Sequence, residues 1–159
     1  HTNTAAGAIP RLMDMGVEAF LLGASLDIVL AQRLVRKLCD KCKKPVSVDE
    51  KLASFLMKEF TNVSQEYLSQ YFENGEIPDT IYEPVGCEHC KDGFKERMAI
   101  FEAILINEEL RNIIVKGYTE EKLYDYLREN NFVNLKQDGL TKALKGYLSV
   151  EELLTSIDI

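Results

Sequence analysis

Two Cys-x-x-Cys pairs constrain this chain more than any other feature of its sequence. They are Cys39–Cys42 and Cys87–Cys90, and together they contain all four cysteines of the 159 residues. Two intervening residues let one tight turn direct both sulfurs at a single point, and two such turns complete a tetrahedral shell with metal–sulfur distances of about 2.3 Å. The spacing therefore predicts a closed, all-thiolate zinc site with Cys39, Cys42, Cys87 and Cys90 as ligands.

Disulfide bonds and an iron–sulfur cluster are the alternative uses of four cysteines. The chain is rich in charged residues and we expect no signal peptide, which favours a reducing compartment and therefore zinc. His89 lies between the last two cysteines, but four sulfurs already complete the shell, so we interpret it as a solvent-exposed residue of the turn. Lys41, Lys43 and Lys44 are expected to offset the negative charge that four thiolates leave on a divalent ion.

Composition indicates an ordinary globular domain. The 159 residues are 46% hydrophobic and 28% charged, which is enough apolar material for a core. The longest apolar stretch, from Val17 to Val35, is interrupted by three charged residues, so we expect no transmembrane segment. Because the sequence begins with His1 rather than methionine, we expect it to be a piece of a longer protein.

Charge is distributed unevenly along the chain. Residues 1–48 contain seven basic and four acidic side chains, whereas residues 49–159 contain twelve basic and twenty-two acidic ones. The acidic part argues against broad nucleic-acid binding, and no basic face interleaved with aromatic residues accompanies the cysteines. We therefore expect no direct contact with nucleic acid.

The pattern of apolar residues predicts a mainly helical chain with strands next to the cysteines. Residues 28–38 begin like a helix and end in alternation, so we expect a helix that turns into a strand and delivers Cys39 at its end. Residues 97–106 are predicted to form a second strand, and antiparallel pairing of the two would place the metal at the tip of the ribbon. Helices are expected over residues 5–15, from residue 18, and over residues 49–60, 108–115, 119–131, 137–147 and 150–157.

A long segment, residues 45–84, lies between the two cysteine pairs. Forty-four residues separate Cys42 from Cys87, so a bound ion would close a long loop, which is where a metal clip contributes most to holding a chain together. We interpret this segment as an insertion attached to the metal site.

Several motifs resemble the C-terminal part of the secretion ATPases, which drive type II secretion and type IV pilus assembly. The resemblance starts at a histidine box and runs nearly from end to end. Its weakest part is residues 45–84, because family members commonly have a shorter loop between the cysteine pairs. The segments that carry it are His1 to Glu18, Leu30 to Cys39, Gly86 to Cys90, Gly93 to Glu102, Asp138 to Leu140, Gly146, and Ser149 to Leu153.

The resemblance implies an α/β fold rich in helix: the distal part of a RecA-like ATPase domain with a tetracysteine zinc subdomain and C-terminal helices. The implied domains are a distal segment of the ATPase core (1–38), a zinc-binding subdomain with its helical insertion (39–96, with 45–84), a returning core strand (97–107) and a C-terminal helical region (108–159).

The resemblance also implies ATP and Mg²⁺ as cofactors of the intact parent, and a homo-hexamer that works with an inner-membrane platform protein. Its implied location is cytoplasmic, peripheral to the bacterial inner membrane. By the same resemblance, His1 would lie toward the nucleotide and signal the state of its γ-phosphate. Arg33, in the Gln-Arg-Leu motif, would lie near the nucleotide or a neighbouring subunit.

A phosphate-binding loop of the form Gly-x-x-x-x-Gly-Lys-Ser/Thr does not occur in the 159 residues. Without its backbone donors and its lysine at the β- and γ-phosphates, we expect this chain to be inactive alone. The leading interpretation is a C-terminal fragment of a type II secretion or type IV pilus assembly ATPase. The alternative is a stand-alone zinc-bearing protein-interaction module with no catalytic activity.

Overall fold

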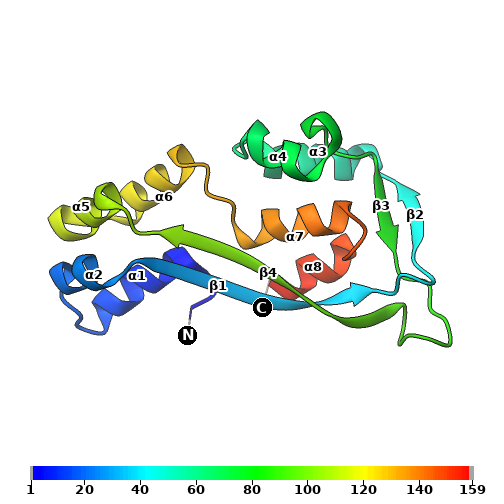
Figure 1. Ribbon diagram of the computed structural model, residues 1–159, viewed down its shortest axis with the longest axis horizontal. Coiled ribbons are helices and arrows are strands. Elements are labelled where there is room, and N and C mark those ends of the chain that lie inside the picture. Colours follow the sequence, from blue (N-terminus) through cyan, green and yellow to red (C-terminus); the bar gives the residue numbers. More distant parts are fainter. Residues whose placement is uncertain (1, 158–159) are drawn as a thin grey trace. The chain divides into compact units, whose positions relative to one another are not determined.

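The computed structural model describes residues 2–157, and within them helices outnumber strands (Figure 1). The mixture of helix and sheet agrees with the helix-rich α/β composition expected from the sequence. None of the helices in this part of the chain is long and apolar enough to cross a membrane. The elements are α1 (Ala5–Asp14), α2 (Ala19–Ser25), β1 (Ile28–Leu38), β2 (Lys44–Ser47), α3 (Glu50–Phe60), α4 (Gln65–Tyr71), the short 3₁₀ helix η1 (Glu73–Gly75), β3 (Thr80–Glu83), β4 (Phe94–Leu105), α5 (Glu108–Gly117), α6 (Glu120–Glu129), α7 (Leu135–Leu144) and α8 (Val150–Ile157).

The chain packs into two compact units. The first contains the chain as far as Ala31 together with Glu102–Asn134, and the second contains Gln32–Phe101 together with the chain from Leu135 onward. These units are defined by packing, and the functional division into residues 1–38, 39–96, 97–107 and 108–159 remains a prediction.

Strands β1 and β4 pair in a two-stranded ribbon and run in opposite directions (Figure 1). At one end the Ile106 amide donates to the Asp27 carbonyl (2.9 Å), and at the other the Cys39 amide donates to the Gly93 carbonyl (2.9 Å). Between these two bonds the β4 side has one residue more than the β1 side. The extra residue fits a β-bulge at Glu96, whose φ is 69°. The predicted antiparallel pairing, which brings both cysteine pairs to the same end of the ribbon, is confirmed.

The prediction that residues 28–38 begin as a helix is wrong, because the whole segment is strand β1. Exposed and less exposed side chains alternate from Ile28 to Lys37, as in a strand and not in a helix. Ile28, Val29 and Val35 are β-branched and favour the extended backbone, and pairing with β4 settles the choice. The apolar run alone did not distinguish the two structures.

The first unit has a core made by its helices and the adjoining ends of β1 and β4. Thr4 caps α1 by accepting a hydrogen bond from the Gly7 amide (3.1 Å). A second acceptor comes from β4, where the buried carboxylate of Glu102 accepts from the Ala5 amide (2.5 Å). The apolar residues buried in this core are Ala5, Ala6, Ile9, Leu22, Ile104, Ile106, Leu110, Ile114, Leu123, Tyr126 and Leu127.

In the second unit, the segment between the cysteine pairs forms a hairpin with two helices at its far end. Strands β2 and β3 pair antiparallel, with Lys44 opposite Glu83, and α3 and α4 lie between them in the sequence. Helix α3 is held to α7, because the Gln137 side chain donates to the Glu59 carbonyl (2.8 Å) and Lys136 pairs with the Glu59 carboxylate (3.4 Å). The expected insertion is therefore not a free loop: it packs against a C-terminal helix.

Helix α7 also protects the outer edge of β4. The Ile106 amide, just after β4, donates to the Asp27 carbonyl, just before β1. Backbone groups of successive residues in a strand face opposite sides, so the odd-numbered residues in this part of β4 direct theirs away from β1. Asp138 accepts from the Phe101 amide (2.8 Å) and Lys142 donates to the Ala99 carbonyl (3.0 Å). Two charged side chains of α7 thus satisfy an edge that would otherwise be open to another strand.

Helices α7 and α8 approach closely at Gly139, and this contact predicts the effect of Gly139→Ala. A Cβ atom on Gly139 would lie 2.3 Å from Cδ1 of Leu153, which is fully buried. Alanine is favoured over glycine in a helix by about 1 kcal/mol, but relieving the clash would displace the buried side chain of Leu153 in the core. We therefore expect Gly139→Ala to lower the free energy of unfolding by about 1–3 kcal/mol, measured by chemical denaturation.

The Leu153→Ala background supplies the control for this prediction. If the clash causes the loss, Gly139→Ala should cost much less stability when Leu153 has already been shortened. An equal cost in both backgrounds, or a gain of stability in the Gly139→Ala single variant, would contradict the proposed contact.

Candidate metal centre

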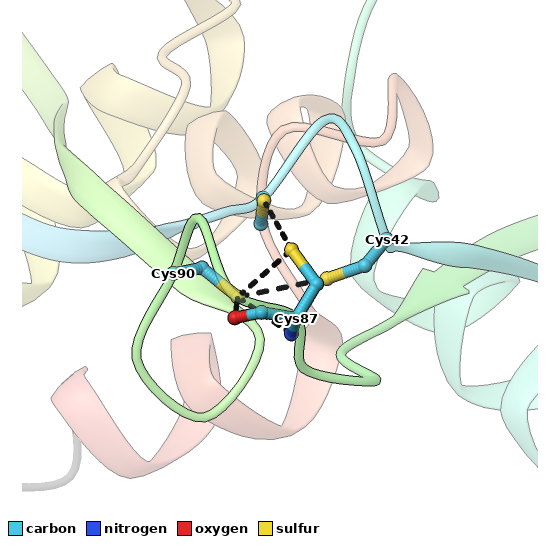
Figure 2. A group of neighbouring side chains, drawn as sticks. Cys42, Cys87 and Cys90 are labelled. Carbon is cyan, nitrogen blue, oxygen red and sulfur yellow. Dashed lines mark hydrogen bonds between the residues drawn. The ribbon is translucent and has the colours of Figure 1, made fainter.

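The four cysteines meet where β1 ends and β4 begins. Cys39 follows the last residue of β1, Cys42 precedes β2, and Cys87 and Cys90 lie in the turn before β4. Their sulfur atoms all lie within 4.8 Å of one another. Figure 2 shows the labelled Cys42, Cys87 and Cys90 converging from the two turns.

The distances between the sulfurs suit one metal ion. The Sγ atoms are separated by 3.9 Å for Cys39 and Cys87, and by 3.7 Å both for Cys42 and Cys90 and for Cys87 and Cys90. A tetrahedral shell with metal–sulfur distances of about 2.3 Å places its sulfurs about 3.8 Å apart. The four cysteines are free rather than disulfide-bonded. The donor set and its spacing therefore fit a structural metal ion.

Backbone hydrogen bonds form both cysteine turns. The Cys42 amide donates to the Cys39 carbonyl (3.3 Å), and the Cys90 amide donates to the Cys87 carbonyl (3.2 Å). Amides also donate to sulfur, from Gly86 to Cys42 (3.4 Å) and from Cys87 to Cys90 (3.3 Å). Such bonds favour thiolate over thiol, which is the form that binds a metal.

Glycine closes the second turn. Gly93 has φ 85°, and a Cβ atom at this position would lie 2.4 Å from Cβ of Pro84. Only glycine combines this backbone conformation with so close an approach. The cysteine pair before β4 therefore depends on Gly93 as well as on its two sulfurs.

The thiols differ in acidity. Partial burial opposes ionisation of Cys90, but the backbone amides of Cys87 and Gly93 help to lower its pKa to about 7. The His89 amide favours the Cys87 thiolate, yet burial and the neighbouring sulfurs raise the pKa of Cys87 to about 11. Four sulfurs in one place resist carrying four negative charges, and a bound cation is what removes that resistance.

The lysines beside the first turn are engaged locally. Lys37 and Lys43 both pair with Asp40, at 3.0 and 2.8 Å, and their hydrogen bonds lower the pKa of Asp40 to about 2. Lys44 pairs with Glu83 at 3.7 Å. Of the three lysines that were expected to offset the thiolate charge, Lys43 and Lys44 therefore also have carboxylate partners.

Neither His89 nor Arg33 belongs to the cluster of candidate metal ligands. His89 is exposed and contacts Glu88 (3.4 Å). Arg33 is a partly buried residue of β1, six positions before Cys39, which corresponds to about 20 Å along an extended strand. His1 lies outside the described residues, so its predicted place near a nucleotide stays a prediction, as does that of Arg33.

The sequence did not indicate that the turn between α7 and α8 docks onto the first cysteine turn. Lys43 Nζ donates to the Gly146 carbonyl (2.7 Å), and the Leu38 amide donates to the Tyr147 carbonyl (2.8 Å). More than a hundred residues separate these partners, and Gly146 is the only local sign of a turn there. The metal centre therefore includes a corner of the C-terminal helices.

This arrangement is suited to structure rather than to reaction. Four sulfurs fill a tetrahedral shell and leave no position for water or substrate. Among the residues that the structure describes, the candidate ligand cluster consists of the four cysteines without a histidine or carboxylate. A metal held here would join strands β1 and β4 at this end of the ribbon.

Comparison with known proteins identifies the family. The profile of the type II/IV secretion system protein family matches residues 1–155. The chain is 36% identical over 154 residues to the type IV pilus assembly ATPase PilB of Pseudomonas aeruginosa, covering 96% of this chain and 25% of that protein. It is 40% identical over 156 residues to the type II secretion system protein E of Aeromonas hydrophila, covering 97% and 28%.

A third relative extends the same relationship. The PilB protein of Thermus thermophilus is 39% identical over 157 residues, which is 97% of this chain and 16% of that protein. The chain thus spans about a quarter or less of the length of these relatives, while nearly all of it is matched by each of them. The chain therefore belongs to the type II/IV secretion system protein family.

Proposed function

We propose that this chain forms the C-terminal part of a hexameric ATPase that powers type II secretion or type IV pilus assembly. The observation that carries the proposal is the match over residues 1–155 to a secretion family whose members include named pilus assembly ATPases. In the complete protein the chain would contribute the distal part of a RecA-like domain. Such a protein would act in the cytoplasm at the inner membrane.

The metal centre would serve this protein as a structural zinc site. Cys39, Cys42, Cys87 and Cys90 would hold the ion, and their spacing and thiolate-favouring amide contacts support zinc over harder cations. Zinc supplies a fixed cross-link here and no chemistry of its own. Nucleotide hydrolysis would depend on residues that this sequence does not contain, since it has no phosphate-binding loop.

The cross-linked ribbon gives the chain a route for transmitting movement. The centre closes the end of β1 and β4 and is bonded to the α7–α8 turn through Leu38 and Lys43. In the proposed motor, movement driven by ATP would reach this zinc-held unit and its helices, and they would pass it to an inner-membrane platform protein. The stand-alone interaction module is less well supported. Both the named relatives and the family profile point to a secretion machine.

Zinc binding is tested by metal analysis of the purified chain. We expect elemental mass spectrometry to find about one zinc ion per chain. We expect the Cys87→Ser variant to lose the ion, because its three remaining sulfurs leave the tetrahedral shell open. His89→Ala is the matched control: it changes a residue between two ligands and should keep the ion. A wild-type chain that is free of metal and equally stable with and without added zinc would refute the site.

ATP hydrolysis tests the division of labour. We expect the 159-residue chain to release no phosphate from ATP above background, because backbone donors and lysine for the β- and γ-phosphates are missing. A longer polypeptide from the same reading frame that includes a phosphate-binding loop should hydrolyse ATP. Two results would contradict the proposal. One is ATP hydrolysis that co-purifies with the 159-residue chain, and the other is an upstream reading frame that encodes no phosphate-binding loop.

A further inference from the structure

Helix α7 ends in a Schellman motif at the corner (residues 142–149) that leads into α8. The Gly146 amide donates to the Ala143 carbonyl (2.9 Å), and the Tyr147 amide donates to the Lys142 carbonyl (3.0 Å). Gly146 has φ 76°, the left-handed conformation that this motif needs. The corner therefore has a defined closed state whose opening would break these two bonds.

Residues next to the metal ligands donate hydrogen bonds to the Gly146 and Tyr147 carbonyls of this corner. Lys43, which follows Cys42, donates from Nζ to the Gly146 carbonyl (2.7 Å). Leu38, which precedes Cys39, donates its amide to the Tyr147 carbonyl (2.8 Å). The Lys43 ammonium also sits at the C-terminal end of α7, where the helix dipole favours a positive charge.

The position of Lys43 depends on the first cysteine turn. Its amide donates to the Cys39 carbonyl (3.0 Å), and its ammonium donates to Asp40 within the turn (2.8 Å). The ammonium lies 5.3 Å from the ring centre of Tyr82. That ring packs so closely on Gly146 that a Cβ atom there would lie 2.7 Å from it. Lys43 thus joins the cysteine turn, the hairpin and the corner.

We propose that Lys43 is a latch that makes the order of the α7–α8 corner depend on the state of the metal centre. With the four sulfurs held together, the turn fixes Lys43 and the corner is closed. When the sulfurs are not held, the turn loosens, Lys43 leaves the Gly146 carbonyl and the corner opens. This role rests on the proposed metal centre, and it does not depend on nucleotide hydrolysis.

Amide hydrogen exchange in the 159-residue chain tests the latch. The samples are the zinc-loaded wild type, the wild type treated with a chelator, and zinc-loaded Lys43→Met, which keeps the aliphatic stem and removes the charge. We expect both chelation and Lys43→Met to speed exchange of the Gly146 and Tyr147 amides about five- to tenfold. This increase corresponds to the loss of about one hydrogen bond. The zinc content of Lys43→Met should equal that of the wild type.

Lys44→Met is the matched control, because Lys44 pairs with Glu83 in the hairpin and not with the corner. It should leave exchange at Gly146 and Tyr147 unchanged, and amides of α5 and α6 should be unchanged in both variants. Wild-type exchange at the corner in zinc-loaded Lys43→Met would overturn the latch, even if chelation unfolds the whole chain. Equal acceleration by Lys44→Met would also overturn it, since the effect would then be one of general surface charge.

Discussion

The second unit depends on the convergence of four sulfurs at the end of the β1–β4 ribbon. Forty-four residues lie between Cys42 and Cys87, and holding the ends of such a loop together costs about 3 kcal/mol of chain entropy. An ion shared by the four sulfurs would offset this cost, and the hairpin β2–β3 would then start with its strands already adjacent. Each strand has only four residues, which is too little to hold a hairpin without such support.

Charge around the centre is balanced locally. Residues 36–44 and 86–97 contain eight basic and four acidic side chains, whereas residues 45–85 contain two basic and eight acidic ones. Part of the basic excess is paired, since Lys37 and Lys43 share Asp40 and Arg36 binds Glu152 through two bonds of 2.6 and 2.5 Å. Four thiolates on one divalent ion would offset two further positive charges. Most of the positive charge in residues 36–44 and 86–97 would therefore be offset close to the centre.

Sequence patterns predicted the parts of this structure that local chemistry determines. Cysteine spacing indicated the ligand set, and the helices predicted from residues 49 and 119 correspond to α3 and α6, whose N-caps are Asp49 and Thr119. The helical start predicted for residues 28–38 failed because an apolar run fits either structure until a partner strand is known. Strands β2 and β3 were missed because each is four residues long and finds its partner more than thirty residues away. The contacts of Lys43 with Gly146 and of Asp138 with Phe101 connect distant segments, and no local pattern encodes them.

A closed tetrahedral shell limits the chemistry that the metal centre could perform. A metal with four sulfur ligands has no site for an attacking water, so the centre cannot activate a nucleophile. In the proposed motor, such a centre would hold shape or pass on movement. The centre is bonded through Leu38 and Lys43 to the turn between α7 and α8, while α7 is bonded to β4 and to the insertion. A change at the sulfurs would therefore be felt first in the arrangement of these helices, before it affected any nucleotide chemistry in the rest of the proposed ATPase.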